Sequence, residues 1–398
     1  MDTGCTRRTI RTSRPRVLLA CSSLLLACLA GCVSVPEQPP VPGADVAWVL
    51  DGAGMLSAAT GAAPMEEPSS LLHVSAEMHQ FALEATRDKP SLSTETLALA
   101  AAMSGSKGLQ LQYDSQATLT PEQAFEQRRA NCLSYTLLFV ALARDVGIPA
   151  EFNDVEVPPI WDLGDDRTML LYRHINARVE LAPPLYAVID VSGEDYDPRF
   201  SQQIISDAEA QAQFYNNRAV EMRLQQRYAD ALRYQLRSLQ LAPRAAYLWT
   251  NLADLYLEGD NLRAARVAVA QALSLDSSDM LSYDTAAQVY ERLGDHRLAA
   301  AFEERVRDFL DENPYYHFHL ALVALFRHDE RLAYDETQRA IELRGDDPDP
   351  RFYVVRAVAL ERLGEAEQAQ DSMRTAIHLN PAQQDRYRNK YERLKQQG

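Results

Sequence analysis

Basic residues are few in this sequence. Its 398 residues contain 40 Lys and Arg against 56 Asp and Glu, which gives a formal net charge of −16 at pH 7. Proteins that bind nucleic acid or anionic membrane surfaces use basic patches to neutralise phosphates. The charge balance therefore argues against nucleic acid as a partner. With 46% hydrophobic residues, the chain can still form two or three domains with hydrophobic cores.

A single apolar run, VLLACSSLLLACLAGC, follows five arginines at the N-terminus. It is too short and wrongly flanked for a transmembrane helix, and the pattern is typical of a secretory signal. Its end, LAGC, resembles the lipobox of bacterial lipoproteins, which implies cleavage before Cys32 and lipidation of that residue. Weaker matches end at Cys21 and Cys28, and an uncleaved anchor helix is a further alternative. Removal of residues 1–31 leaves a net charge of −20.

The lipoprotein resemblance also implies a location. Val33 follows the lipid site, where aspartate would retain a lipoprotein at the inner membrane, so we expect an outer-membrane anchor facing the periplasm. Residues 32–70 are rich in Pro, Ala, Gly and Ser, which predicts a flexible tether with a short ordered piece around VAWVLDG.

Cysteine is scarce as well. Once the signal is removed and Cys32 carries lipid, Cys132 is the only free thiol of the mature chain. It has no partner for an intramolecular disulfide, although exported proteins live where disulfides form. Cys132 is therefore either buried and inert or chemically active.

Two helices separated by a break are predicted around Cys132. LTPEQAFEQRRA starts with Thr120 as N-cap, Pro121 at the first helical position and Gln123 completing a capping box. Asn131 is the N-cap of the apolar stretch NCLSYTLLFVALARDVGIPA, so Cys132 lies in the first turn of a buried helix. The N–H groups and dipole at a helix start favour the thiolate form of a cysteine.

This stretch resembles the transglutaminase-like core, a family with a papain-like fold. In that family a cysteine begins a buried helix that ends in a GIPAR-like turn, to which ALARDVGIPAEF is similar. A histidine and an aspartate follow on two neighbouring strands, and RHINARVEL and YAVIDVSGED offer His174 and Asp190 in that order. The resemblance, which is specific over residues 115–195, implies a catalytic triad of Cys132, His174 and Asp190.

Strand parity tests this pairing without the family. The odd-numbered residues of HINARVEL and the odd-numbered Ala187, Ile189 and Val191 of YAVIDV are apolar, which predicts an antiparallel hairpin with a shared core face. His174 and Asp190 then share the opposite face. Equal parity requires an odd number of loop residues around APPL. The sequence departs from the family at two places: Asn131 replaces a common glycine, and Asn176, on the face of His174, stands where an aromatic residue often follows the histidine.

In the family the cysteine attacks an amide carbonyl, the histidine carries the proton, and the aspartate fixes the histidine tautomer. An amine acceptor makes such a site an acyltransferase, and water makes it an amidase or peptidase. The other histidines show no ligand spacing, and the acidic loops DLGDD and GEDYD are typical of solvated loops, so neither a metal nor a cofactor is expected.

A 34-residue period organises the C-terminal half. Together with small residues that let paired helices approach closely, it resembles the tetratricopeptide repeat. Five units share one phase after two extra residues in RGDDPDP, and PAQQDRYRNKYERLKQQG suits a capping helix. The alanines in phase are Ala219, Ala231, Ala253, Ala265, Ala287, Ala299, Ala321, Ala333, Ala357, Ala369 and Ala376.

The fourth repeat is unusually apolar where the family lines its groove. Equivalent positions in the first three units are mostly polar and include Gln213 and Tyr247. A large apolar patch is costly in water. This one is predicted either to dock an apolar peptide or the catalytic domain, or to pack against the neighbouring repeat. We call these residues the fourth-repeat patch: Tyr315, Phe318, Leu322, Leu325 and Phe326.

The sequence thus predicts an α+β protein with a papain-like transglutaminase core followed by an all-α tetratricopeptide solenoid. The expected domains are a signal (1–31), a tether (32–70), a transglutaminase-like domain (71–205) and the repeat array (206–398). We expect a lipid-anchored cysteine acyltransferase or amidase acting on protein or peptide amides, with repeats that recruit the substrate or a partner. The alternative is a non-catalytic periplasmic scaffold that binds proteins through its repeats.

Overall fold

The structure is a computed structural model. It describes residues 41–56, 64–158, 173–191 and 199–396, together with the backbone of the strands β1 (Thr6–Thr9), β5 (Ile160–Asp162) and β6 (Asp165–Leu171), which pair in the order β1-β6-β5. The apolar N-terminal run and Cys32 lie outside the described residues. Every helix among the described residues falls short of the length or apolarity needed to cross a membrane.

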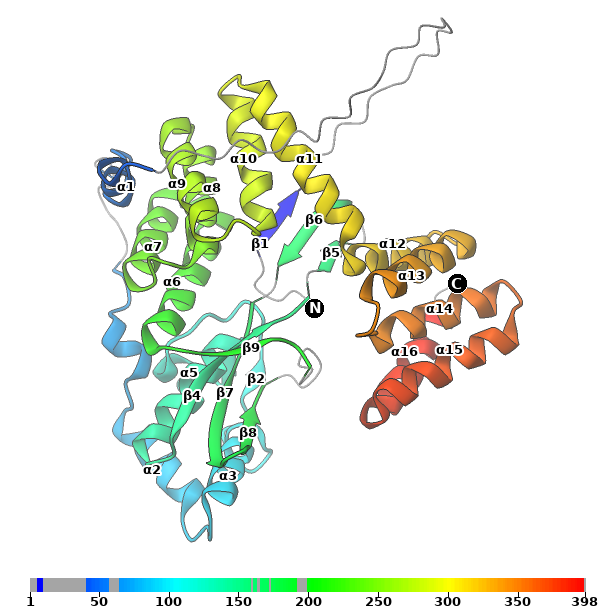
Figure 1. Cartoon of the computed structure of the whole chain (residues 1–398). Helices are drawn as coiled ribbons and strands as arrows, with labels where there is room; N and C mark the ends of the chain where they lie inside the picture. Colours follow the sequence, from blue (N-terminus) through cyan, green and yellow to red (C-terminus); the bar gives the residue numbers. More distant parts are fainter. Residues whose placement is uncertain are drawn as a thin grey trace, which may run out of the picture. The chain divides into compact units, whose positions relative to one another are not determined.

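The chain divides into two compact units. Glu37–Val157 and Tyr172–Ala299 belong to the first, and Pro158–Leu171 and Ala300–Gly398 to the second. The first unit contains the main sheet, its surrounding helices and the first repeats, and the second contains the last repeats (Figure 1).

Four strands form the main sheet among the described residues, in the order β8-β7-β4-β9 with antiparallel neighbours. Ile175, Ala177 and Val179 of β7 share a core cluster with the apolar residues of helix α5, so one face of the sheet is covered by that helix. The strands are β4 (Ala150–Glu156), β7 (Arg173–Ala182), β8 (Leu185–Ile189) and β9 (Gln202–Ile205).

Helix α5 (Cys132–Asp145) is the centre of this domain. All residues from Leu133 to Ala143 are buried, as expected for a helix that is apolar on all sides. The elements that pack around it or close the domain are η1 (Pro68–Leu72), α2 (Ala76–Thr86), α3 (Leu92–Ser104), α4 (Pro121–Gln127) and the short parallel strands β2 (Gln112–Tyr113) and β3 (Arg129–Ala130).

Loop parity between β7 and β8 differs from the prediction. The connecting turn is Pro183–Pro184, an even number of residues, because Ala182 pairs with Leu185. A β-bulge between Glu180 and Ala182 shifts the register by one residue, so that Ala177 pairs with Ile189. The bulge supplies the parity change that the prediction had assigned to the loop.

The repeats predicted from the 34-residue period are present as successive helices. Their small residues from Ala219 to Ala376 are buried. The helices are α6 (Asp207–Leu224), α7 (Tyr228–Leu241), α8 (Ala246–Glu258), α9 (Leu262–Leu275), α10 (Met280–Arg292), α11 (His296–Glu312), α12 (Pro314–Phe326), α13 (Glu330–Arg344), α14 (Pro350–Arg362) and α15 (Ala366–Leu379).

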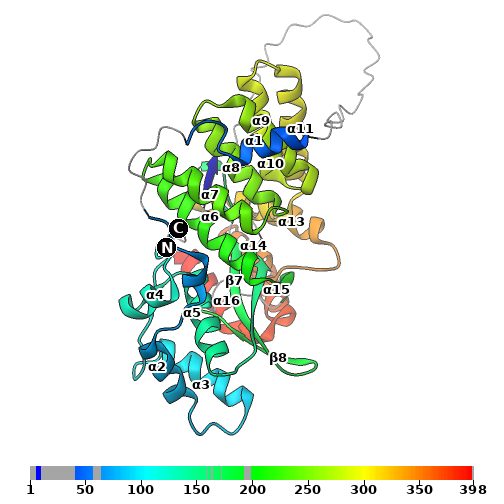
Figure 2. The same ribbon diagram turned by 90° about the vertical axis from the view of Figure 1, so that its left-hand side faces the viewer.

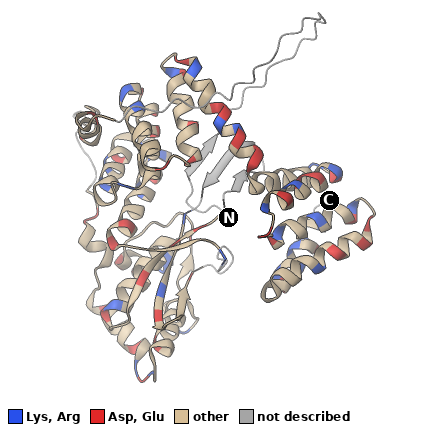
Figure 3. Ribbon diagram, in the orientation of Figure 1, with Lys and Arg blue, Asp and Glu red and all other residues tan. Residues whose placement is uncertain are grey.

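Within four of the repeats the two helices pack side by side: α6 with α7, α8 with α9, α12 with α13, and α14 with α15. The boundary between the two units falls inside α11. The single-turn η2 (Pro381–Gln383) and the predicted capping helix α16 (Gln384–Gln396) close the array, with Tyr387 buried against α14 and α15 residues. Acidic and basic residues are mixed along the repeat helices (Figure 3).

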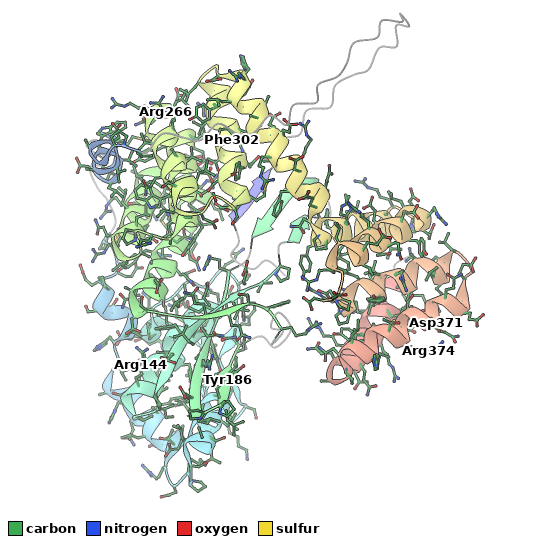
Figure 4. The ribbon with its side chains drawn as sticks, viewed as in Figure 1. Arg144, Tyr186, Arg266, Phe302, Asp371 and Arg374 are labelled. Atoms are coloured by element: carbon green, nitrogen blue, oxygen red, sulfur yellow. The ribbon has the colours of Figure 1, made fainter. Side chains whose placement is uncertain are left out.

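Packing does not stop at the boundary predicted after residue 205. Phe214 and Tyr215 of α6 lie in the same core cluster as Leu137 of α5. Arg144, near the end of α5 and labelled in Figure 4, pairs with Asp207 at 2.8 Å. The first repeat therefore completes the core of the sheet domain.

The short ordered piece predicted around VAWVLDG, within the expected tether, is a helix. Helix α1 (Gly43–Leu50) packs along α9, as Figures 1 and 2 show from two sides. The Tyr256 hydroxyl donates to the carbonyl of Val49, and the guanidinium of Arg263 lies over the Trp48 ring. Burial of Val49 and these contacts offset the entropy that a free tether would keep.

Candidate active site

The start of α5 is fixed by side-chain hydrogen bonds. The side chain of Asn131 accepts from the backbone N–H of Ser134 at 2.8 Å, as expected of an N-cap, and its Nδ2 donates to Thr118. The Ser134 hydroxyl donates to the carbonyl of Ala117 and accepts from the N–H of Leu119. Cys132, the first residue of the helix, therefore occupies a rigid position. Its thiol is free and partly buried.

The structure brings His174 and Asp190 together. Nε2 of His174 lies 2.6 Å from Oδ2 of Asp190, and both side chains are less than a tenth exposed. Continuing the β7–β8 register beyond the Ala177–Ile189 pair places Asp190 opposite Asn176, with His174 two residues further along the same face. This is the shared face that the parity of the two strands predicts.

The surroundings of His174 favour its charged form. Burial lowers the pKa of the His174 imidazole. Hydrogen bonds to Asp190 and Cys132, together with the charges of those two groups, raise the pKa by more than burial lowers it, so that it lies at about 10. At neutral pH the ring is therefore protonated. In that form the ring can donate a proton to a group bound beside it.

A hydroxyl joins α5 to the strand that carries the histidine. Oγ1 of Thr136, one turn after Cys132, donates to the carbonyl of its own helix at Cys132 and lies 3.2 Å from the carbonyl of Ile175. Thr136 is buried, so the contact is shielded from water. It fixes the spacing between the cysteine helix and β7 next to His174.

Two amide side chains near Asp190 were not predicted as part of the site. Nδ2 of Asn176 donates to Oδ2 of Asp190 at 3.1 Å, and Nδ2 of Asn153 donates to Oδ1 of Asn176 at 2.8 Å. Asn176 stood out only as a departure from the family pattern. Asn153 lies in EFNDV on β4, and only the pairing of β4 with β7 brings it to Asn176.

Two predicted groove positions contact the sheet domain. Nε2 of Gln213 donates to Oδ1 of Asp154 at 3.0 Å, and the guanidinium of Arg173 stacks over the ring of Tyr247 at 4.3 Å. Arg173 also forms an ion pair with Asp154. The inner faces of the first two repeats thus hold the strand ends of β4 and β7, and Arg173 directly precedes His174.

The fourth-repeat patch is mostly engaged in packing within the second unit. The ring of Phe318 stacks on the buried Phe352 of the next repeat with centroids 4.9 Å apart, and Tyr315 meets the same ring edge-on at 5.5 Å. Leu322 packs against a core cluster that contains Leu325. The structure describes all five patch residues, and among them only Phe326 is widely exposed, with 70% of its surface accessible to solvent.

Because of this packing, we expect Phe318→Asp to destabilise the second unit by about 3 kcal/mol, the usual range for loss of an aromatic side chain from a core. Phe326→Asp is the matched control, since Phe326 belongs to the same patch but is exposed, and its expected cost is within about 0.5 kcal/mol. Thermal melting of both variants checks this. A melting temperature that stays unchanged in Phe318→Asp would exclude a core role for Phe318 and leave the docking interpretation of the patch open to a binding test.

No three His, Cys, Asp or Glu side chains are grouped to hold a metal ion in the part of the chain that the structure describes. The face of β7 and β8 that carries His174 also carries Arg178, whose guanidinium lies 4.0 Å from the ring centroid of Tyr186. Tyr186, labelled in Figure 4, is partly exposed there.

Comparison with known families agrees with this architecture. The transglutaminase-like superfamily matches residues 79–153, and the tetratricopeptide repeat matches residues 246–279 and 350–383. The chain therefore contains a transglutaminase-like domain and tetratricopeptide repeats. The first match includes Cys132 but ends before His174 and Asp190. No curated protein sequence matches the chain.

Solved structures resemble the repeats. The Cut9–Hcn1 assembly of APC/C matches at 18% identity and TM-score 0.25, over 43% of this chain and 34% of that chain, so only about a third of that protein's length is spanned. YrrB, described as a TPR protein with an unusual peptide-binding site, matches at 17% identity and TM-score 0.24, over 43% of this chain and 87% of that chain. TTC0263, a thermophilic TPR protein of Thermus thermophilus, matches at 18% identity and TM-score 0.23, over 46% of this chain and 98% of that chain. The repeat assignment itself depends on the family match and the helix pairs.

Proposed function

We propose that this protein is a cysteine acyltransferase or amide hydrolase that acts on protein or peptide amides. The observation that carries the proposal is the contact between Nε2 of His174 and Oδ2 of Asp190, next to a free thiol at a helix start. A protein that used this fold only as a scaffold would have no physical reason to keep these three side chains together.

The proposed reaction begins with attack of the Cys132 thiolate on an amide carbonyl. The negative charge that develops on the carbonyl oxygen is stabilised by the backbone N–H at the start of α5. The C–N bond breaks as the His174 imidazolium gives its proton to the leaving amine, which leaves a thioester on Cys132. Water or an amine then attacks the thioester carbonyl and gives its proton to His174. The C–S bond breaks, the acid or new amide is released, and Cys132 leaves as the thiolate. Asp190 holds the ring and balances its charge in both steps.

The repeats are proposed to recruit the substrate protein or a partner. Tetratricopeptide repeats bind proteins through the concave surface that their stacked helices form. In the first two repeats, contacts to β4 and β7 already occupy Gln213 and Tyr247. We therefore expect a partner to use later repeats, including the exposed Phe326.

The enzyme and scaffold hypotheses are separated by trapping the thioester. The protein is incubated with a library of glutamine-containing peptides and a biotinylated alkylamine, quenched in acid and analysed by intact mass. A peptide adduct on Cys132, with biotin transferred to peptide or peptide deamidated, is the expected result. A library that yields no adduct, combined with Cys132 alkylation no faster than that of an ordinary thiol, would favour the scaffold.

The anchor is a separate part of the proposal. Cys32→Ser is expected to move the protein from the membrane fraction to the soluble periplasmic fraction, because a lipid on Cys32 would be its attachment. Fractionation with immunoblotting measures this, and Val33→Ser, which leaves the cysteine in place, is the control. Membrane association that persists in Cys32→Ser would point to an uncleaved N-terminal helix.

A further inference from the structure

Asp190 lies where the backbone pairing of its strand has ended. β8 is the outer strand of the main sheet among the described residues (Figure 1). Its pairing with β7 runs to Ile189. Asp190 therefore follows directly on the paired part of β8, and side-chain contacts from His174 and Asn176 reach its carboxylate.

A row of amide side chains crosses the sheet to reach that carboxylate. Asn153 of β4 lies directly opposite Asn176 of β7 in the register. Nδ2 of Asn153 donates to Oδ1 of Asn176 and, at 3.0 Å, to Oε1 of Gln202 on β9. Asn176 donates in turn to Oδ2 of Asp190. We call Gln202, Asn153 and Asn176 the amide ladder. It joins β9, β4 and β7 and reaches Asp190, the residue that follows β8.

The amide ladder has a direction. Asn153 presents a donor to Asn176, so Asn176 must turn its oxygen toward Asn153 and its nitrogen toward Asp190. The reverse orientation would place an amide oxygen against the carboxylate and two N–H groups against each other. Both asparagines are fully buried, where an unmatched polar pair is costly. Among the described residues, Oδ1 of Asn153 accepts no hydrogen bond. Asn153 therefore takes part in the amide ladder only through the bonds that its Nδ2 donates.

We infer that Asn153 and Asn176 are positioning residues for the triad, an inference that rests on the proposed amide chemistry at Cys132. Oδ2 of Asp190 accepts from both His174 and Asn176. The amide N–H therefore locates the oxygen that holds the imidazole and stabilises the ionised carboxylate. The first repeat begins at Asp207, two residues after β9, so the ladder also connects the triad to the strand that leads into the repeats.

The test uses Asn153→Asp, a change at a residue without contact to the triad. A carboxylate at this position accepts hydrogen bonds only, so the amide of Asn176 turns around and its oxygen faces Asp190. The rate of Cys132 alkylation by iodoacetamide near neutral pH, followed by peptide mass spectrometry on the full chain, is expected to fall by about tenfold to about a hundredfold, the equivalent of one hydrogen bond to a charged group. The rate should then rise with pH as it does for an ordinary thiol.

Two further variants keep the inference testable if Asn153→Asp folds poorly. Asn176→Leu removes the donor to Asp190 directly and should give the same loss. Asn153→Leu leaves Asn176 able to face Asp190, so its rate should fall by less than about threefold. A role in packing alone predicts equal losses in Asn153→Leu and Asn153→Asp that follow the melting temperature, and that result would overturn the inference.

The chain offers a matched control. Nδ2 of Asn251 on α8 donates to Oδ1 of Asn216 on α6 at 2.7 Å, the same kind of asparagine pair away from the triad. Asn251→Asp should leave the alkylation profile unchanged. If the wild-type thiol is activated and Asn153→Asp leaves its alkylation profile unchanged, the positioning role is contradicted while the proposed function stands. If the wild-type thiol has ordinary reactivity, the proposed function itself is contradicted.

Discussion

Cys132→Ala is expected to abolish acyl transfer and amide hydrolysis, with a loss of at least about a thousandfold, because it removes the sulfur that forms the thioester. Cys132 is the only free thiol among the described residues, and it is partly buried at the first position of α5. Loss of one sulfur there leaves the Asn131 cap and the Ser134 contacts in place. The melting temperature should therefore stay within about 4 °C of wild type, the equivalent of about 1 kcal/mol or less.

The measurement is steady-state turnover of whichever glutamine peptide forms the adduct with wild-type protein. Thr375→Ala provides a control, since its hydroxyl bonds only to a carbonyl of its own helix in the second unit. Turnover retained in Cys132→Ala would remove the cysteine mechanism, whatever the stability of the variant.

Asp190→Ala is expected to have the second largest effect, about a thousandfold in turnover. His174 would lose one of the hydrogen bonds that raise its pKa to about 10, together with the charge of Asp190, and so part of the preference for the imidazolium that supplies a proton to the leaving amine. A smaller loss is expected for Asp190→Asn. One oxygen can still accept from both His174 and Asn176, so the orientation of the ring survives and mainly the charge is lost.

Comparison of the two Asp190 variants separates orientation from charge. Their turnover is measured as a function of pH, together with their melting temperatures. Equal losses in Asp190→Ala and Asp190→Asn would show that the charge alone matters, and activity near wild type in Asp190→Ala would exclude Asp190 from the triad.

The parts of the site that follow from local sequence were predictable. Capping chemistry located the start of α5 at Cys132, because Asn131 satisfies an N–H group that the helix itself leaves open. Strand periodicity placed His174 and Asp190 on one face, because side chains alternate along β7 and β8. Both arguments use residues close together in the sequence.

The parts that depend on distant pairing were not predictable. Asn153 reaches Asn176 only through the register of β4 with β7, and Gln202 joins them from β9. Neither register follows from a local pattern. The docking of α1 on α9 is of the same kind, since the Tyr256 hydroxyl meets the carbonyl of Val49 across more than two hundred residues. A composition rich in Pro and Gly gave no sign of this partner.

The central claim is that Cys132 works as a thiolate paired with His174, and the pH dependence of its alkylation tests this without knowledge of the substrate. At pH values below its pKa of about 8.5, an ordinary thiol reacts about tenfold faster for each unit by which the pH is raised. Because the pKa of His174 is raised to about 10, its imidazolium persists through neutral pH, and we predict that the iodoacetamide rate of Cys132 changes by less than about threefold between about pH 6 and about pH 8. A rate that climbs like that of an ordinary thiol, or a thiol that does not react across this range, would contradict the account.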